Sequence, residues 1–283
     1  MLDIPTTREG LSGNMLWNTI TPEILPVSAL LIVGSVAIIG RERLFRFANN
    51  YRQQLRSAAP AIATLGGLLV LNQLFREVGT ELSWLIGWNI TGAIYEIEGG
   101  FVGWLQFIIP EIMTPLFGAI YMVGYVFLLV FPVIAYLVLR DHRFLRETAF
   151  AYSINHVLGL VLYVTIIAYG PRNIIPDLVE PLLYITWPES QIVTSEVNTN
   201  TNVFPSLHTS MSVTVALLAY RTRDIYPVWF PIASVLAVGV VISTMYLGIH
   251  WGIDVLAGTA LAVIAIKGSQ FIDARWARRV SDC

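Results

Sequence analysis

The sequence predicts an all-α fold, a polytopic bundle of membrane helices, on three observations. Of its 283 residues, 55% are hydrophobic and only 13% are charged, whereas a soluble domain carries about a quarter charged residues. Several apolar runs approach the roughly 20 residues that a helix needs to cross a bilayer. The basic residues gather in a few segments between alternate runs, as the positive-inside rule expects. No stretch is left for a separate soluble domain.

Apolar runs give the candidate spans and the organisation of the chain. Their approximate bounds are 23–40, 58–75, 112–139, 148–169, 206–220, 226–247 and 251–268. The last three are short, so we expect about six or seven membrane helices. The chain then divides into an N-terminal segment with an extra span (1–57), a membrane core (58–268) and a basic tail (269–283).

The basic residues predict the orientation of the bundle. Fourteen of the 17 lie in segments 41–57, 140–147 and 221–223 and in the tail from Lys267 onward. Alternating spans place all of these on one side, which the positive-inside rule makes cytoplasmic. We therefore expect an integral protein of the cell (plasma) membrane, with its N-terminus outside.

Composition also narrows the partners. A formal net charge of −2 argues against nucleic acid as a partner. The single cysteine, Cys283, excludes an intrachain disulfide and a cysteine-based metal site. The first 20 residues lack the features of a cleavable signal peptide, so the run at 23–40 is expected to stay as a span.

Two long connections lie on the outer side. In residues 76–111, Trp84, Trp88 and Trp104 stand among apolar and acidic residues. Tryptophan is enriched at membrane interfaces, so we expect one or two helices lying in the plane of the interface. Residues 170–205 form the second connection.

Two histidines open spans from this outer side. His250 and Asp254 begin the seventh span and are four residues apart, so they share a helix face. An aspartate there can accept the Nδ1–H of the imidazole, which leaves the Nε2 lone pair free. His208 begins the fifth span. All three side chains are therefore expected at one depth near the outer interface.

The start of the fifth span predicts an anion site. Pro205 suits the first helical position, which would leave the backbone N–H groups of Ser206, Leu207 and His208 free at the positive end of the helix dipole. Arg172 leaves the fourth span at the same level. Imidazoles, a hydroxyl, a helix N-terminus and a guanidinium are the parts that phosphoryl transfer needs.

The runs "PSLH" at 205–208 and "STMYLGIHWGID" at 243–254 together resemble the type 2 phosphatidic acid phosphatase superfamily. Its pattern is Lys-x6-Arg-Pro, then Pro-Ser-Gly-His, then Ser-Arg-x5-His-x3-Asp. The resemblance covers roughly 58–268 and implies a helical membrane core. The matching residues are Pro205, Ser206, His208, Ser243, His250 and Asp254.

The sequence departs from that pattern in three places. Leu207 replaces the glycine, and Thr244 replaces the arginine of the last motif. In the first motif, Arg172 follows Pro171 instead of preceding a proline, and no lysine lies upstream of it. Leu207 and Thr244 resemble the inositol phosphorylceramide synthase (aureobasidin-resistance) branch, which transfers a phospho-headgroup between lipids. Arg76, at the outer end of the second span, is a candidate for the missing cation.

The resemblance implies metal-independent chemistry without a cofactor on a lipid phosphate or a phospholipid. His250 is then the nucleophile, Asp254 orients it, and His208 is the general acid, with a histidine-linked intermediate. Arg172 and Ser206 bind the phosphate. Transfer to an alcohol is slightly favoured over hydrolysis.

Two other function classes stay open. A lipid or small-molecule transporter or scramblase would suit a protein with 21 glycines, but no matching pair of broken helices in two halves is evident. A serine hydrolase using Ser206 would need a strand–turn–helix elbow, which this segment lacks. Asn155 and His156 are expected to make interhelical hydrogen bonds. The oligomeric state is left open.

Overall fold

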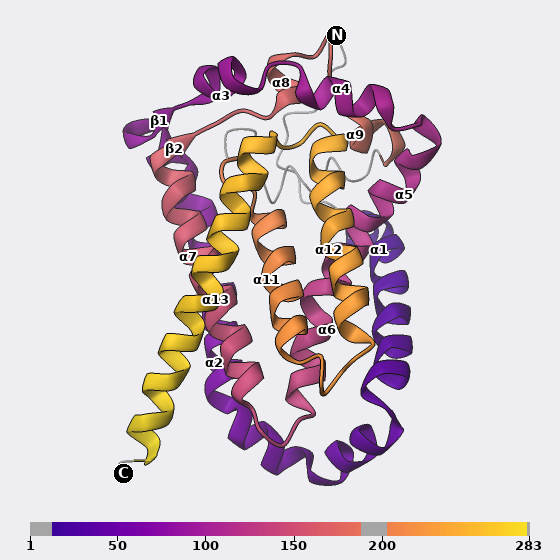
Figure 1. Cartoon of the computed structure of the whole chain (residues 1–283), viewed down its shortest axis with the longest axis vertical. Helices are drawn as coiled ribbons and strands as arrows, with labels where there is room; N and C mark the ends of the chain where they lie inside the picture. Colours follow the sequence, from indigo (N-terminus) through magenta and orange to yellow (C-terminus); the bar gives the residue numbers. More distant parts are fainter. Residues whose placement is uncertain (1–12, 188–202, 282–283) are drawn as a thin grey trace.

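Long helices run along one axis, and short helices cover one end of the bundle (Figure 1). The computed structural model describes residues 13–187 and 203–281. The long helices are α1 (Gly13–Gly34), α2 (Arg41–Ile86), α6 (Tyr125–Leu137), α7 (Arg143–Thr165), α11 (Leu207–Arg221), α12 (Trp229–Tyr246) and α13 (Gly252–Ser281). The shorter elements are η1 (Ser35–Ile39), β1 (Trp88–Asn89), α3 (Thr91–Glu98), α4 (Phe101–Ile108), η2 (Glu111–Met113), α5 (Thr114–Ala119), η3 (Ile120–Gly124), β2 (Ile166–Ile167), α8 (Pro171–Ile174) and α9 (Leu182–Thr186). The predicted helical membrane bundle is confirmed, with one two-residue parallel strand pair added.

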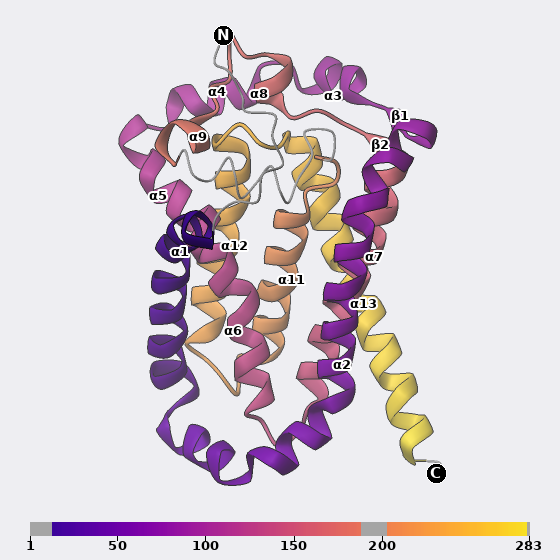
Figure 2. The same ribbon diagram turned by 180° about the vertical axis from the view of Figure 1, so that it is seen from behind.

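Helix α11 occupies the centre of the bundle, between α6, α7, α12 and α13 (Figures 1 and 2). Its buried residues mix apolar side chains such as Met211 and Val215 with hydroxyls such as Ser210 and Thr214. Lipid offers no hydrogen-bond partners, so these hydroxyls belong inside the protein. Asn155 of α7 meets them, donating to Thr214 Oγ1 at 3.0 Å and accepting from Ser210. Its predicted interhelical role is thus confirmed.

Fewer helices meet the criteria for a membrane span than the sequence predicts. Among the described residues, these are Glu111–Leu137, Arg143–Thr165, Trp229–Tyr246 and Gly252–Arg278, with a fifth candidate if the bent pair Ile24–Ile39 and Arg41–Leu68 counts as one span. The predicted span 206–220 does form a helix, α11, of 15 residues. At about 1.5 Å per residue it rises roughly 22 Å, less than a hydrocarbon core of about 30 Å. Surrounded by other helices, it needs no greater length.

The basic segment 41–57, predicted to be a connection, is the first part of α2. The axis turns by 104° between Ile24–Ile39 and Arg41–Leu68. Helix α2 then crosses the lower end of the bundle and rises beside α7 (Figure 2). Non-helical dihedral angles at Asn50 mark a break within it. The arginines mark a cytoplasmic segment by their charge, but arginine also has a high helix propensity, so a helix can continue through them.

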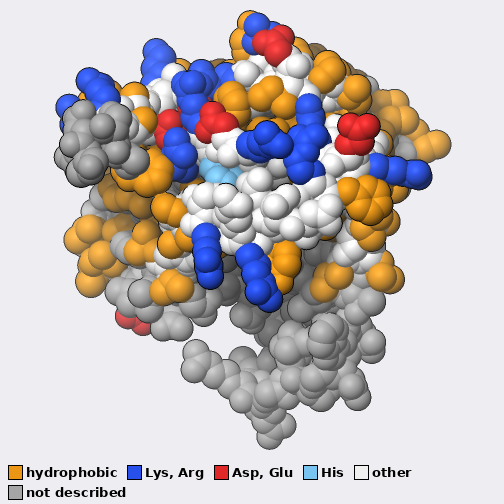
Figure 3. Space-filling view, turned by 90° about the horizontal axis from the view of Figure 1, so that it is seen from below, with side chains coloured by type: hydrophobic (Ala, Val, Ile, Leu, Met, Phe, Trp, Pro, Cys, Tyr) orange, Lys and Arg blue, Asp and Glu red, His pale blue; other side chains and the backbone are white. Residues whose placement is uncertain are grey.

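Basic side chains gather on the lower face of the molecule (Figure 3). The start of α2, the α6–α7 and α11–α12 turns and the end of α13 all lie there (Figure 1). Arg221 of α11 donates to both oxygens of Glu147 in α7, and Arg143 Nε donates to its Oε1 at 2.9 Å. Arg146 pairs with Asp273 of α13 at 2.7 Å. These ion pairs join α7, α11 and α13 at the basic end.

The opposite end is covered by residues 76–111, which form two short helices after the end of α2. Helices α3 and α4 lie across the ends of the long helices (Figure 1). Trp88 and Phe107 are 75% and 88% exposed. Exposed aromatic side chains of this kind suit a membrane interface, in line with the prediction for this segment.

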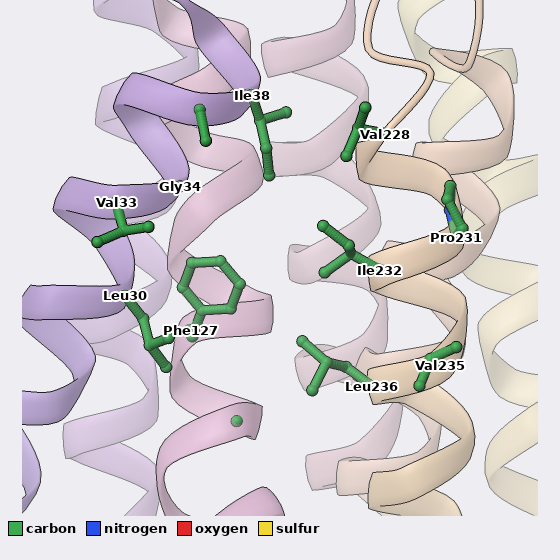
Figure 4. Close-up of a pocket in the computed structure, with 12 residues that line it drawn as sticks. Leu30, Val33, Gly34, Ile38, Phe127, Val228, Pro231, Ile232, Val235 and Leu236 are labelled. Carbon is green, nitrogen blue, oxygen red and sulfur yellow. The ribbon is translucent and has the colours of Figure 1, made fainter.

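An apolar cavity of about 610 Å³ lies between α1 and α12 (Figure 4). Leu30 and Val33 line one side, Ile232 and Leu236 the other, and Phe127 of α6 lies between them. The lining is apolar, so this cavity offers neither a nucleophile nor an anion-binding donor. The chemistry has to be sought at the capped end.

Candidate functional site

The loop between α12 and α13 fixes the place of His250. Gly248 has a φ of +75°, a conformation that favours glycine, and a Cβ there would come within 2.9 Å of the Glu180 carbonyl oxygen. The chain then turns back onto α12, because the N–H groups of Ile249 and His250 donate to the Thr244 carbonyl at 3.1 and 3.0 Å. As a result, the His250 side chain is buried.

Asp254 lies beside the His250 imidazole in the first turn of α13. Its Oδ2 is 3.4 Å from Nδ1 of His250 and accepts the Trp251 backbone N–H at 2.9 Å. With Nδ1 facing a carboxylate, the proton belongs on Nδ1 and Nε2 keeps its lone pair. Nε2 of His250 and Oδ1 of Asp254 are buried and have no hydrogen-bond partner among the described residues.

The start of α11 is joined directly to this turn of α13. The Ser206 backbone N–H donates to the Asp254 carbonyl oxygen at 3.0 Å. A Cβ at Gly258 would collide with the Ser206 carbonyl oxygen, so glycine lets the two helices approach closely. The two motifs, far apart in the sequence, therefore meet through their backbones.

This junction corrects the predicted anion site. Helix α11 begins at Leu207, two residues after Pro205, the predicted first helical position, and Ser206 stands just before it, where its Oγ accepts the Thr209 N–H at 3.3 Å. Serine is a preferred N-cap. The Ser206 N–H is already bound to α13. One of the three predicted donors is therefore engaged within the protein.

The Leu207 side chain packs against α7. A Cβ at Gly159 would come within 2.5 Å of it, so a glycine on α7 makes room for the leucine. What remains of the predicted anion site, within the described chain, is the Ser206 hydroxyl proton and the backbone N–H groups of Leu207 and His208.

His208 lies between two tyrosine rings. Its ring centroid is 4.7 Å from that of Tyr121 in η3 and 4.5 Å from that of Tyr125 in α6. The centroid of the His250 ring is 6.3 Å away. At this separation the two imidazoles are too far apart to bond to each other and close enough to contact one small group between them.

Arg172, in α8, packs against the α12–α13 loop. Its backbone N–H donates to the Gly248 carbonyl at 3.3 Å. Its Nη2 donates to the Tyr184 hydroxyl at 2.8 Å, and the guanidinium lies 4.4 Å from the centroid of that ring. Nη1 is buried without a partner among the described residues.

Arg76 is the residue predicted to replace the missing cation. The backbone of Arg76 belongs to α2, but its side chain lies outside the described residues. Thr244, at the position of the family's arginine, is fully buried. Its hydroxyl donates to the Val241 carbonyl at 2.8 Å, and its own carbonyl holds the loop of His250. Thr244 therefore shapes the loop.

Four residues of this region were not recognised from the sequence. Tyr121 and Tyr125 carried a signal, because tyrosines four residues apart in an aliphatic span share one face. Tyr184 lies in a connection without periodicity. Glu98, at the end of α3, accepts the N–H groups of the first two residues of α13 at 2.7 and 3.0 Å. It is one of several acidic residues in 76–111, and no sequence pattern singles it out.

One predicted structural histidine differs from expectation. His156 was expected to bond between helices, but its Nδ1 lies 3.1 Å from the Tyr152 carbonyl oxygen of its own helix. A side chain four residues ahead reaches that carbonyl without crossing to a neighbour. His156 therefore belongs to the packing of α7.

The assembled site combines a base with a cationic donor. Buried polar atoms without a partner are rare in proteins, so Nε2 of His250 and Nη1 of Arg172 indicate where a polar ligand would bind. An imidazole lone pair and a guanidinium are groups that suit attack on an anionic phosphoryl group. Within the described part of the chain, no three His, Cys, Asp or Glu side chains are placed to hold a metal ion.

Comparison with known proteins gives a family match. A family model described as the PAP2 superfamily matches residues 102–268, which is more than half of the chain. The matched region runs from α4 into α13 and includes His208, His250, Asp254 and Arg172. Helices α1, α2 and α3 lie before it. No curated protein and no solved structure matched the chain.

Proposed function

This chain belongs to the PAP2 superfamily, and from that premise we propose that it is an integral-membrane enzyme that transfers a phosphoryl group or phospho-headgroup from a lipid by way of His250. Family membership supports a lipid phosphatase or phosphotransferase. The observation that carries the role of His250 is its buried, unpartnered Nε2, with Nδ1 facing Asp254.

In the first step, Nε2 of His250 attacks phosphorus and forms a nitrogen–phosphorus bond. The bond from phosphorus to the leaving oxygen breaks, and protonated His208 gives its proton to that oxygen. The 6.3 Å between the two ring centroids supports a phosphoryl group held between them. Asp254 keeps the nucleophile in one tautomer and stabilises the cation that forms.

The transition state places negative charge on the non-bridging oxygens. Nη1 of Arg172 and the hydroxyl proton of Ser206 are donors that no hydrogen bond within the described residues engages, and we assign them to these oxygens. Donors fixed before the reaction contribute most to catalysis. Arg172 and Ser206 are therefore the phosphate-binding residues of the proposal, with Arg76 as a further candidate.

In the second step, neutral His208 takes a proton from the acceptor, whose oxygen attacks phosphorus. The nitrogen–phosphorus bond breaks, and His250 returns to its neutral form. The acceptor is water in a phosphatase and an alcohol in a transferase. A substrate that keeps its headgroup would leave that headgroup on the phosphorus of the intermediate.

We favour transfer to an alcohol slightly over hydrolysis. Thr244 stands where the family has a second arginine, so Arg172 is the one guanidinium assigned to the site, with Arg76 as a further candidate. Fewer cations suit a phosphodiester, which carries one negative charge less than a monoester.

The proposed reaction uses no divalent metal ion. Activity should therefore survive EDTA, and a strict metal requirement would contradict the proposed mechanism.

We propose that the site faces the extracytoplasmic side of the plasma membrane. The supporting observation is that the basic segments lie at the other end of the bundle (Figures 1 and 3). In a Cys283→Ser background, a cysteine at Glu96 should react with an impermeant reagent in whole cells, and one at Arg223 should not. The opposite pattern would place the site in the cytoplasm.

A transporter or scramblase without chemistry is the second candidate. The 104° bend after α1 and the apolar cavity between α1 and α12 (Figure 4) favour it. A transporter would leave the His250–Asp254 pair at the capped end without a role, since transport of a lipid requires no activated imidazole. Enzymatic turnover separates the two candidates.

The test is turnover by purified protein in lipid nanodiscs. Phosphatidic acid, a polyprenyl diphosphate and phosphatidylinositol are supplied separately, with and without an alcohol, and both free phosphate and new lipids are measured. His250→Ala should lose all turnover. His156→Gln, a histidine of α7 outside the site, is the matched control and should keep it. No turnover with any lipid, or full turnover in His250→Ala, would contradict the proposal.

A further inference from the structure

We propose that Glu98 is a positioning residue for the His250–Asp254 pair, an inference that rests on the function proposed above. Its Oε1 accepts the Gly252 N–H at 2.7 Å, and its Oε2 accepts the Ile253 N–H at 3.0 Å. These are the first two residues of α13, the helix that follows His250 and carries Asp254. One carboxylate from α3 thereby covers the end of the helix on which the site is built.

A helix end of this kind needs acceptors, because its first N–H groups have no partner within the helix. The residue just before the helix usually supplies one from its side chain. Here that residue is Trp251, whose indole N–H donates to the Tyr169 carbonyl at 2.8 Å and which has no acceptor to offer. Glu98 supplies the missing acceptor from another helix.

Asp254 accepts the N–H group of the residue just before the helix. It is the third residue of α13 and accepts the Trp251 N–H at 2.9 Å, as an acidic residue does in a capping box. The same oxygen faces Nδ1 of His250. Three successive N–H groups at this helix end are thus divided between two carboxylates, and only Asp254 is directed at the imidazole.

This division is the reason for assigning a positioning role to Glu98. If its carboxylate is removed, the N–H groups of Gly252 and Ile253 lose their partners. The nearest remaining carboxylate is that of Asp254, which would be drawn toward the helix end and away from His250. Negative charge at a helix N-terminus also offsets the positive end of the dipole, so both carboxylates stabilise this turn.

Helix α3 is held in place by the same group of residues. The Tyr169 N–H donates to Thr91 Oγ1 at 3.1 Å, and the Tyr95 ring meets the Trp251 ring edge-on at 6.3 Å between centroids. Helix α3, Tyr169 and Trp251 therefore form one unit above the site. Glu98 precedes the region that the family model matches, 102–268, so this cap comes from a part of the chain that the match does not cover.

The first test separates the rate from substrate binding. Glu98→Ala should lower kcat roughly 10- to 100-fold, because displacing a reacting group by about 1 Å costs on the order of 100-fold, and should leave KM unchanged. Glu98→Gln keeps an oxygen for one N–H and should recover most of kcat. Glu96→Ala, an exposed glutamate on the same helix, is the matched control and should behave as wild type. Thermal midpoints are measured in parallel, so that only folded protein is scored.

The second test asks whether Glu98 acts through Asp254. Once Asp254→Asn has removed the carboxylate, Glu98→Ala should cost less than about threefold more, because effects that share one partner are not additive. If Glu98 only stabilises the fold, the losses of kcat in the two single variants should multiply in the double variant, or should follow the fraction of folded protein. Either result would overturn the positioning role.

The outcomes also separate this inference from the proposed function. Turnover in His250→Ala would refute the enzyme proposal itself. An inactive His250→Ala together with wild-type kcat in Glu98→Ala would refute the positioning role alone.

Discussion

Two fully buried carboxylates, one at each end of the bundle, are held in opposite ways. Glu147 at the basic end receives hydrogen bonds on both oxygens from Arg221 and one from Arg143. Asp254 at the capped end contacts Nδ1 of His250 and one backbone N–H through Oδ2, while its Oδ1 has no partner among the described residues. A satisfied ionic group joins helices, whereas an incompletely satisfied one retains capacity for chemistry.

The largest effect expected at the capped end comes from His208. His208→Ala should slow reaction of an alkyl phosphate lipid about 100- to 10,000-fold, the usual value of general acid–base help. An activated aryl phosphate ester should be affected far less in the first step, because a phenolate with a low pKa leaves without a proton. Rates with the two leaving groups are compared in one preparation. Equal losses would contradict the assignment of His208 as the acid.

Asp254→Asn should cost on the order of 100-fold in turnover while leaving the fold intact, because the amide keeps the shape but weakens control of the tautomer. Asp224→Asn, an exposed aspartate in the turn at the basic end, is the control. Turnover and thermal midpoint are measured together. A large drop in the midpoint with unchanged turnover would make Asp254 a structural residue like Glu147.

Glu147→Gln should lower the stability of the protein and leave its turnover nearly unchanged, the reverse of Asp254→Asn. It leaves Arg143 and Arg221 without their carboxylate and should destabilise the protein by about 2 kcal/mol, less than a fully buried pair because both arginine side chains are partly exposed. Turnover per folded molecule should stay within about twofold of wild type. Thermal inactivation in nanodiscs measures the loss of stability, and initial rates measure the turnover. Loss of turnover without loss of stability would break the contrast between the two ends.

The smallest effect concerns His142, in the α6–α7 turn, whose Nε2 lies 2.8 Å from Ser57 Oγ. Burial lowers the pKa of His142. Below about pH 6.5 the unfolded chain therefore binds a proton more readily than the folded one, and stability falls as pH falls, by at most about 1.4 kcal/mol per unit. Above that pH the residue is neutral in both states. The thermal midpoint of His142→Gln should vary less between pH 7.5 and 5.5 than that of wild type, and equal variation would contradict the assignment.

The bundle and the positions of its helices were largely predictable, because apolar runs bounded by charged or polar residues determine where membrane helices lie. The run 206–220 became α11 (Leu207–Arg221), and 226–247 became α12 (Trp229–Tyr246). Which apolar runs and charged segments join into one continuous helix was harder to predict. The arginines of 41–57 predict a connection on one side of the membrane, but charge does not end a helix, and these residues form the start of α2.

The partners of the site residues were not predictable. The Ser206 N–H is engaged only because Gly258 lets α13 approach α11, and no local pattern reports an approach between distant segments. The same holds for Glu98, whose partners Gly252 and Ile253 are distant in the sequence. Spacing predicts which residues share a helix face, and tertiary packing decides which donors remain free.

The most direct test of the central claim is to trap the intermediate. Protein in nanodiscs is incubated with a lipid phosphate that carries labelled phosphorus, quenched in alkali without an acceptor alcohol, digested and analysed by mass spectrometry. We expect label on Nε2 of His250, absent in His250→Ala and present in His156→Gln. Label on His208 or Ser206, or turnover that persists in His250→Ala, would contradict the role of His250 as the nucleophile.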